Sequence, residues 1–380
     1  RSSKKVDHYK PNRIYVERSV RHTWVARNVL ERVDSTPVEF IDDTGSLLQE
    51  AKRWNPSVSQ GKKSLILARQ KGHFFKACPA GRGRSVCCNY FVINYAANCH
   101  MECSYCYLQS YLNFPHMVVY ANHEDLLGEL TSVFQENPES FFRIGTGELA
   151  DSLALDPLTS YSEPLVEFFS QQKNAVLELK TKSDCIANLL PLDHGRRTVV
   201  AWSINPRIIQ EEEEHKTASI EQRFAAAEDC AEAGYKIGFH LDPMIDYPDW
   251  EGDYRGLIDE IFDRIPSASI PWISVGTLRL TPELRDIMRS RFPNSPLTMG
   301  ELVPTDDGKM RYFRPNRVRM YQAVLGWVRR HSQKTAVYLC MESPGVWSKI
   351  FAAPPPSDVE VGDSIVASDL APDRTAIAST

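Results

Sequence analysis

The position of the cysteines is the feature that most constrains what this chain can fold into. Six of its nine cysteines lie in a single stretch that runs from Cys78 to Cys106. In a chain of 380 residues, such clustering is typical of metal ligation in a reducing compartment such as the cytoplasm, and not of a disulfide scaffold. The first ten residues, RSSKKVDHYK, contain no apolar segment of the kind found in a secretory signal.

Composition sets the size of the core and narrows the classes of partner. With 42% hydrophobic residues the chain can bury a large core, and its length predicts one large domain or two of about 150 residues. Because it contains no run of about 18 apolar residues, we expect no membrane-spanning helix and no membrane partner. The formal net charge of −5 does not indicate nucleic-acid binding, so any such surface must come from local clustering.

Short β-rich runs alternate with amphipathic stretches from about residue 88 to residue 343. This order predicts a parallel α/β sheet or barrel, in which chemistry takes place beyond the C-terminal ends of the strands. The clearest helix begins after Ser219, which forms a capping box with Gln222, and ends before Gly234. The expected strands are residues 90–94, 141–144, 175–180, 198–203, 236–241 and 272–278.

Cys99, Cys103 and Cys106 form a C-x3-C-x2-C motif directly after the first of these strands. Three thiolates on one short loop can bind three corners of an iron–sulfur cluster and leave one iron open for catalysis. The alternative is a structural zinc site with His100 or Cys88 as the fourth ligand. Zinc sites favour C-x2-C pairs repeated at a distance, and no second pair follows here, so the spacing favours the cluster.

The motif and its surroundings resemble a known enzyme family. C-x3-C-x2-C followed by an aromatic residue is the signature of the radical S-adenosylmethionine (SAM) superfamily, and the string NCHMECSYCYLQSYL resembles the spore photoproduct lyase family. Similar segments extend from about residue 25 to residue 345. The resemblance implies an α/β fold with a partial (β/α)6 barrel of the TIM type. It also implies a 4Fe–4S cluster bound by the three cysteines and SAM bound in the barrel mouth.

The same resemblance implies a division of the chain. Residues 1–75 would form an N-terminal extension packing on the barrel, and residues 76–300 the barrel with its cluster loop. Residues 301–350 would form a basic and aromatic hairpin and helix that bind substrate. The Pro-, Ser- and Asp-rich residues 351–380 are predicted to be a disordered tail.

Candidate SAM-binding residues lie at the ends of the predicted strands. The segment FFRIGTGE resembles the Gly-Gly-Glu turn that meets the SAM amino group. Two glycines also suit an ordinary strand-ending turn, but the position after the cluster loop favours SAM binding. His240 and Asp242 alternate along their strand, so we expect both side chains to point into the barrel, and the alternative is two buried polar residues satisfied by hydrogen bonds. The residues that match SAM-binding positions of the family are Gly145, Gly147, Glu148, Lys182, Ser203, Asn205 and Asp242.

Members of the resembled family reverse a methylene-bridged thymine dimer in DNA. A one-electron donor such as flavodoxin or ferredoxin would allow reductive cleavage of SAM to a 5′-deoxyadenosyl radical, and the cofactor would supply this chemistry. The radical abstracts a hydrogen atom from the lesion, and a cysteine returns one. Tyrosines beside the last cluster cysteine are implicated in that return, which makes Tyr105 and Tyr107 candidate catalytic residues.

Glu148 occupies the position of the family's hydrogen-donating cysteine. A carboxylic O–H bond is too strong to replace a thiol as a hydrogen-atom donor, so three explanations stay open. Another cysteine could donate, with Cys78, Cys87 or Cys88 nearest in sequence. Tyr107 could quench the radical. Alternatively, the substrate is a different small molecule or an RNA, and Glu148 serves chemistry of another kind or simply binds SAM.

Residues 309–330, here called the basic segment, carry seven Lys or Arg residues, no acidic residue and interleaved aromatics. Such a pattern suits a nucleic-acid groove, and a flipped-out dimer lesion would need one. The alternative is a solvated charged face backed by core aromatics, and a non-enzymatic zinc-bearing nucleic-acid-binding protein is the remaining function class. The candidate substrate-binding residues are Arg311, Tyr312, Arg317, Arg319 and Tyr321.

Overall fold

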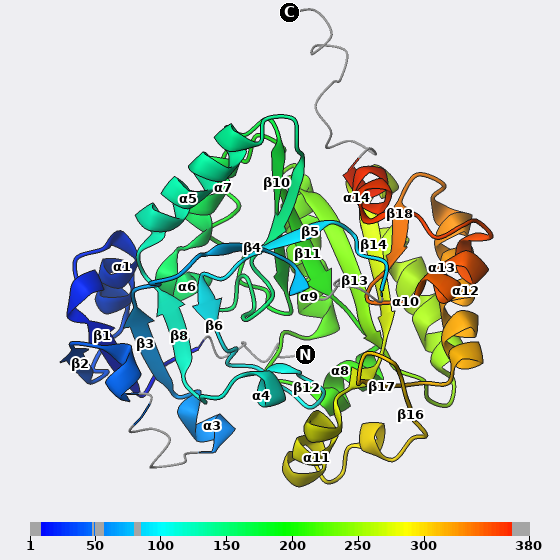
Figure 1. Cartoon of the computed structure of the whole chain (residues 1–380), viewed down its shortest axis with the longest axis horizontal. Helices are drawn as coiled ribbons and strands as arrows, with labels where there is room; N and C mark the ends of the chain where they lie inside the picture. Colours follow the sequence, from blue (N-terminus) through cyan, green and yellow to red (C-terminus); the bar gives the residue numbers. More distant parts are fainter. Residues whose placement is uncertain (1–8, 48, 50–56, 80–84, 367–380) are drawn as a thin grey trace, which may run out of the picture.

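The structure is a computed structural model that describes residues 9–47, 49, 57–79 and 85–366. Its main sheet curls into a half barrel with the strand order β18-β14-β13-β11-β10-β9-β5-β4 (Figure 1). All neighbouring pairs are parallel except β4–β5, which is antiparallel. The strands are β4 (Phe75–Ala77), β5 (Tyr90–Ile93), β9 (Phe142–Gly145), β10 (Ala175–Thr181), β11 (Thr198–Ser203), β13 (Lys236–Met244), β14 (Trp272–Thr277) and β18 (Ala336–Leu339).

The six strands predicted from the sequence are therefore confirmed, and β18 extends the sheet beyond them. Helices cover the outer face of the sheet, as Figure 1 shows. The capping box of Ser219 and Gln222 is present in α9, and Gly234 follows that helix with a φ of 90°. The main outer helices are α5 (His123–Glu136), α7 (Ser162–Ser170), α9 (Ile220–Glu232), α10 (Trp250–Arg264) and α12 (Arg314–His331).

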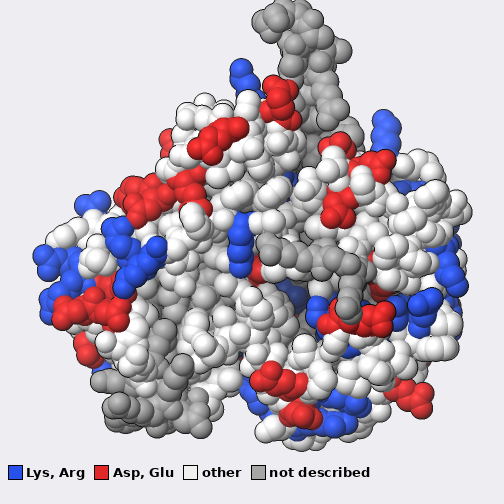
Figure 2. Space-filling view, viewed as in Figure 1, with Lys and Arg blue, Asp and Glu red and all other residues white. Residues whose placement is uncertain are grey.

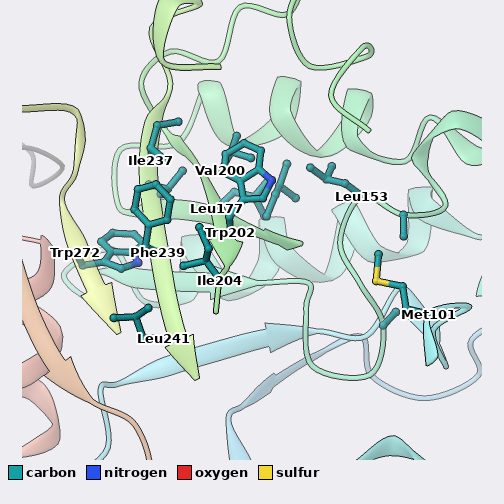
Figure 3. Close-up of a cluster of buried hydrophobic side chains, with 14 of the residues drawn as sticks. Met101, Leu153, Leu177, Val200, Trp202, Ile204, Ile237, Phe239, Leu241 and Trp272 are labelled. Carbon is teal, nitrogen blue, oxygen red and sulfur yellow. The ribbon is translucent and has the colours of Figure 1, made fainter. Parts of the chain in front are cut away.

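Apolar and polar residues alternate along the strands, which separates an apolar outer layer from a polar interior. In β10, Leu177 and Leu179 are fully buried, while Glu178 and Lys180 take the alternate positions on the other face. Figure 3 shows Leu177 in the core cluster with Val200 and Trp202 of β11. Burying apolar area of this kind stabilises the sheet against its helices and leaves the inward face free for polar groups.

The N-terminal residues form a second sheet that reaches the cluster motif. Its strand order is β2-β1-β3-β8-β6, in which β6 is antiparallel to β8 and the other pairs are parallel. Because β6 lies just before Cys99, this sheet supports the cysteine motif from the side opposite the barrel. The strands are β1 (Arg13–Glu17), β2 (Val38–Ile41), β3 (Ser64–Ala68), β6 (Ala96–Ala97) and β8 (Met117–Tyr120). Short helices α1 (Trp24–Arg32) and α3 (Val58–Gly61) connect them.

The predicted disorder from residue 351 onward is wrong for residues 358–366. These residues form helix α14 (Asp358–Val366), which packs on β18. Val361 and Ile365, four residues apart, are both buried and give the short helix one apolar face. Gly362 allows close approach, because a Cβ there would lie 2.8 Å from that of Asn89. Residues 367–380 lie outside the described residues.

A small antiparallel sheet precedes the long helix α12. It has the order β15-β17-β16, with β15 (Arg279–Leu280), β16 (Val303–Pro304) and β17 (Met310–Arg311), so a hairpin followed by a helix is present in residues 301–350. Helix α11 (Pro282–Arg291) connects β15 to this hairpin, and α13 (Pro344–Phe351) follows β18. Among the described residues, none of the helices combines the length and apolarity needed to cross a membrane.

Candidate active site

Residues 99–106, here called the cluster loop, connect the N-terminal sheet to the mouth of the half barrel. The loop begins at Asn98, which has a φ of 74° and whose side-chain oxygen accepts a hydrogen bond of 2.9 Å from the amide of Cys99. Its centre pairs as β7 (Glu102–Cys103) with β12 (Glu214–His215). The amide of Cys106 donates to the carbonyl of Cys103 at 3.2 Å. All three predicted cluster cysteines thus lie on one tightly held turn.

The three thiols fit an iron–sulfur cluster better than a single zinc ion. Among the described residues, no three His, Cys, Asp or Glu side chains converge on one point as a single metal ion requires. Both candidate fourth zinc ligands, Cys88 and His100, contact other side chains. Cys88 accepts a 2.9 Å hydrogen bond from Arg143, and His100 packs on the ring of Tyr9 with centroids 5.4 Å apart.

Burial keeps the thiols of Cys99 and Cys103 protonated until a metal replaces the protons. Burial, together with the nearby Asp151 charge, raises the pKa of Cys99 to about 12. Burial also raises the pKa of Cys103, while the cation of Lys182 opposes the shift. Because iron binds the thiolate, cluster assembly would release these protons, and a cationic group beside Cys103 favours that step.

A buried hydrogen-bond network joins the cluster loop to the end of β11. The hydroxyl of Tyr105 donates to Glu214, whose carboxylate also forms a 2.7 Å ion pair with the fully buried Arg223. Asn205 donates to Glu214 at 3.0 Å and accepts from Tyr254 at 2.7 Å. Burial alone would raise the pKa of Glu214, but Arg223 and Lys182 outweigh it and lower the pKa. Tyr105 and Asn205 therefore hold the loop as members of one network.

Glu148 lies on the other side of the loop, in a polar group that sequence reasoning did not assemble. Its carboxylate is 3.1 Å from the ammonium of Lys76 in β4, and the amide of Asn94 bridges the same two groups when its nitrogen faces Glu148 at 3.0 Å. The hydroxyl of Tyr107 donates to the backbone carbonyl of Glu148. The residue after the last cluster cysteine thus contacts the residue in the family's donor position.

The two glycines before Glu148 lie where neighbouring side chains pack closely against the backbone. A Cβ at Gly145 would lie 1.5 Å from the hydroxyl of Tyr90 on the neighbouring strand β5, so a side chain cannot be placed there. A Cβ at Gly147 would lie 3.1 Å from that of Lys180. The backbone of this turn therefore passes close to β5 and β10, which is an explanation for the glycines that needs no ligand.

Asp151, to which sequence reasoning gave no role, positions the end of β10. Its carboxylate accepts hydrogen bonds from the amides of Leu153 and Ala154 at 3.0 and 2.9 Å. It also accepts from the Thr181 hydroxyl at 2.6 Å and the Lys182 amide at 2.8 Å. The Lys182 ammonium lies 5.8 Å from the centroid of the Tyr105 ring, beside the cluster loop. An acidic residue just after a glycine turn was the available signal, because such residues often bond nearby amides.

Asp242 and His240 are each hydrogen-bonded to a charged residue from another strand or turn. Asp242 makes a bidentate ion pair with Arg279, with both N–O distances at 2.8 Å. His240 instead lies 2.6 Å from Glu178. Ser203, at the end of β11, is buried and its carbonyl accepts from Arg223 at 2.9 Å. Ser203 ends β11 and is in register with His240 of β13, and Asp242 lies two residues farther along β13.

A charged layer fills the barrel interior below the mouth. The Arg143 guanidinium lies over the rings of Tyr90, Trp272 and Tyr338, at 4.7, 5.1 and 5.0 Å from their centroids. Burial would raise the pKa of Glu178, but His240 and Arg143 outweigh it and lower the pKa to about 2. Single charged residues inside the apolar strands FFRIG and AVLELK were the sequence signal for this layer.

The comparison with known families decides which family the chain belongs to. The family model for spore photoproduct lyase matches residues 9–320, a range that contains the cluster loop and every barrel strand from β4 to β14. The chain belongs to the spore photoproduct lyase family. The sequence-based prediction of a radical SAM lyase of this family is thereby confirmed.

Individual lyases and solved structures agree with the family assignment. The chain is 23% identical to the spore photoproduct lyase of Clostridium acetobutylicum over 293 residues, which is 76% of this chain and 84% of that protein. It is 27% identical to the Bacillus subtilis lyase over 225 residues, covering 58% and 64% of the two chains. A solved spore photoproduct lyase complexed with dinucleoside spore photoproduct aligns with a TM-score of 0.76 at 21% identity, covering 88% of this chain and all of that one. A mutant with bound AdoMet and the same dinucleoside aligns equally well, with a TM-score of 0.76 at 20% identity.

Most candidate substrate-binding side chains of the basic segment are held by partners from other parts of the chain. Arg311 forms bonds of 2.5 and 2.7 Å with Asp307, and Arg317 and Tyr321 both bond Glu342, at 2.8 and 3.0 Å. Tyr312 accepts from the amide of Asp246 at 3.1 Å. These four predicted substrate-binding side chains are buried in this structure, and their role in substrate binding stays a prediction.

Arg319 is the exception among the five candidates. Its side chain is 56% exposed, lies 5.4 Å from the Trp250 ring and has acidic neighbours Asp246 and Glu251 at 3.8 and 3.9 Å. On the face drawn in Figure 2, a hollow near the centre has Lys or Arg side chains at its border, and charges of both signs are interspersed around it. The acidic partners lie outside the basic segment, so its own composition could not reveal them.

The extra cysteines of this family member fall into two groups. Arg143 holds Cys88, and Cys88 donates to Cys87, whose pKa falls to about 6 mainly because of that hydrogen bond. Cys78 follows β4, and a charge on it would raise the pKa values of both Tyr107 and Cys340. Of the three predicted alternative donors, Cys78 is therefore the one whose charge is coupled to Tyr107.

Proposed function

We propose that this chain binds a 4Fe–4S cluster through Cys99, Cys103 and Cys106 and SAM in the mouth of the half barrel. One observation carries the proposal: a three-thiol loop stands at the C-terminal edge of the sheet in a chain that belongs to the spore photoproduct lyase family. When bound, the cluster and SAM together supply a carbon-centred radical. The protein's own residues would hold SAM, align the substrate and exclude water.

The residues around the mouth divide these tasks. Lys182, fixed by Asp151 at its backbone, would place a cation near the cluster loop for the SAM carboxylate. Ser203 and Asp242, at neighbouring strand ends, would contact SAM from the opposite wall, with Asn205 holding that wall through Glu214. The Arg143 and Glu178 layer closes the barrel below and limits entry of water to the mouth.

We propose a thymine dimer lesion in DNA as the substrate, which agrees with the dinucleoside found in solved members of the family. Glu148 cannot return the hydrogen atom, and its carboxylate is engaged by Lys76. Cys78, whose charge is coupled to Tyr107, would return it instead. Arg319 supplies an exposed cation for the nucleic acid, and a small electron-transfer protein such as flavodoxin or ferredoxin would deliver the electron.

The test is one anaerobic turnover with reconstituted protein, SAM, dithionite and an oligonucleotide that carries the spore photoproduct. We expect 5′-deoxyadenosine together with restored thymine, both separated by chromatography. Formation of 5′-deoxyadenosine without thymine would keep the radical chemistry and remove the DNA lesion as substrate. Absence of both products from protein that contains its cluster would remove the enzymatic proposal.

A second candidate keeps the cofactors and changes the substrate to a small molecule or an RNA. The Glu148–Lys76 pair and the burial of four candidate DNA-binding residues favour it. Binding of a thymine-dimer duplex separates the two candidates. A fluorescence anisotropy titration that shows no preference for damaged over undamaged duplex would favour the second candidate over repair.

A further inference from the structure

Arg291, at the last position of α11, contacts the cluster loop from a distant part of the chain. Its guanidinium lies 2.5 Å from the carboxylate of Glu102, the residue before Cys103. The same group donates to the side-chain oxygen of Gln109 and to the hydroxyl of Ser59, the latter at 3.0 Å. One side chain therefore joins helix α11 to the N-terminal region at Ser59, to the middle of the cluster loop at Glu102 and to the residues just after the loop at Gln109.

The partners of Arg291 in turn hold the backbone around Cys103. Gln109 donates to the carbonyl of Ser104 at 2.7 Å. Lys62, which is 3.7 Å from Glu102, donates to the carbonyl of Met101 at 2.6 Å. Backbone carbonyls on either side of the middle cluster cysteine are thus fixed by side chains that belong to one network. Such second-layer contacts are what orient metal-binding side chains before the metal arrives.

The charges of this network are unequal. Glu102 is 6% exposed and faces three cations, Lys62, Arg291 and Lys216, the last at 3.6 Å. Three cations around one carboxylate leave a surplus of positive charge directly beneath the loop. A loop of three thiolates carrying an iron–sulfur cluster is anionic, so this surplus complements the occupied form of the loop.

We propose that Arg291 is a positioning residue for the iron–sulfur cluster, because it keeps the cluster loop in its ligand-ready shape through Glu102 and Gln109. This inference rests on the proposed cofactor. It concerns a residue of the C-terminal half that lies nearly two hundred positions from the motif, and it assigns α11 a role in cluster retention. Loss of Arg291 should loosen the apo loop, weaken cluster retention and make the cluster harder to reduce.

The experiment compares Arg291→Gln with Arg289→Gln on the same helix. Arg289 has a 52% exposed side chain and a 4.0 Å ion pair with Asp286, so it matches the charge change without touching the loop. Three quantities are measured: amide hydrogen exchange of residues 99–109 in the apoprotein, iron and sulfide per chain after anaerobic reconstitution, and the midpoint potential by an EPR-monitored titration. For Arg291→Gln we expect loop exchange faster by about tenfold or more, the scale of a lost charged hydrogen bond. We also expect lower iron content and a more negative potential.

Two further variants keep the test decisive. Arg291→Lys retains a cation for Glu102, but a single ammonium cannot replace the forked guanidinium that also reaches Gln109. Compared with Arg291→Gln, it should therefore bring the midpoint potential closer to the wild-type value than it brings the rate of loop exchange. If Arg291→Gln fails to fold, Glu102→Gln removes the same ion pair while the Arg291–Gln109 bond remains. This variant should also lower the iron content per chain.

The outcomes separate this inference from the proposed function. Wild-type protein that takes up no cluster would overturn both. Wild-type protein that loads normally, beside Arg291→Gln protein with unchanged exchange, iron content and potential, would overturn only the role of Arg291. Equal losses in Arg289→Gln would show a general effect of charge on α11 and would also overturn it.

Discussion

The cluster loop and the basic segment present the same kind of sequence signal and fold in opposite ways. Both concentrate chemically active side chains in a short stretch, but the cluster loop keeps its three thiols on one turn held by backbone bonds, whereas Arg311, Arg317 and Tyr321 turn inward to acidic partners. The difference is in what defines each pattern. The spacing of metal ligands is a geometric requirement that a loop must satisfy. A high content of charged residues sets no such requirement, because the charges can form buried ion pairs as well as an exposed surface.

The largest effect is expected from Cys99→Ala, which breaks the loop side of the comparison. Removing one of three thiolates should abolish the cluster absorbance and with it 5′-deoxyadenosine formation, because the remaining two ligands cannot hold the open-iron arrangement. Iron analysis and ultraviolet–visible spectra of anaerobically purified protein measure the result. Cys87→Ala is the matched control, and equal iron content in both variants would contradict the assignment of the ligands.

The next effect is expected from Cys78→Ala, which sharpens the question posed by Glu148. Thymine formed per 5′-deoxyadenosine should fall by at least about tenfold, because a step after radical formation is removed while SAM cleavage continues. Product ratios in single-turnover assays measure it. Cys88→Ala, whose thiol is held by Arg143 away from Tyr107, should leave the ratio unchanged. A fall in the Cys88 variant alone would move the donor to the vicinal pair.

Arg317→Ala tests the segment side of the comparison against Arg319→Ala. Loss of Arg317 leaves the carboxylate of Glu342 buried beside one remaining tyrosine, so unfolding free energy should fall by about 3–5 kcal/mol. Loss of the half-exposed Arg319 should cost less than about 1 kcal/mol. Urea denaturation measures both. If Arg317→Ala keeps full stability and loses DNA binding, the exposed-face interpretation is restored.

The smallest effect concerns the charged layer beneath the mouth and appears as a dependence on pH. The pKa of Glu178 falls from 4.5 to about 2 on folding, so its ionised form stabilises the native state above pH 4.5. This contribution should be lost progressively as the pH falls from 4.5 to about 2. Glu178→Gln should weaken the dependence of the unfolding free energy on pH within that window. Urea titrations at several pH values measure this dependence. An unchanged slope would show that Glu178 titrates normally.

The repeated strands and the cluster ligands could be predicted because each depends on local pattern. Alternation in AVLELK and the capping box at Ser219 act over a few residues, and the C-x3-C-x2-C spacing belongs to one loop. The structure then adds partners that the sequence keeps far apart. Glu102 meets Arg291, and Asp242 meets Arg279, only because the barrel brings distant strand ends together.

Predictions from composition alone failed where a partner was supplied from another segment. The basic segment has no acidic residue, but Asp307 precedes it and Glu342 follows β18, so Arg311 and Arg317 are neutralised in the fold. In the same way, a tail rich in Pro, Ser and Asp suggested disorder. Val361 and Ile365 nevertheless provide enough apolar surface for α14 to dock on β18.

The docking of α14 has a consequence for association between molecules. A half barrel is an open sheet, so β18 at one end and the three-residue β4 at the other are edge strands, and an edge strand has backbone N–H and C=O groups that no neighbouring strand pairs. The short β4 offers little template for another chain, whereas β18 is protected by α14 and by the residue 85–89 segment, whose Val86 amide bonds the carbonyl of Glu342 at 3.0 Å. The C-terminal helix therefore serves the protein as a guard against edge-to-edge aggregation.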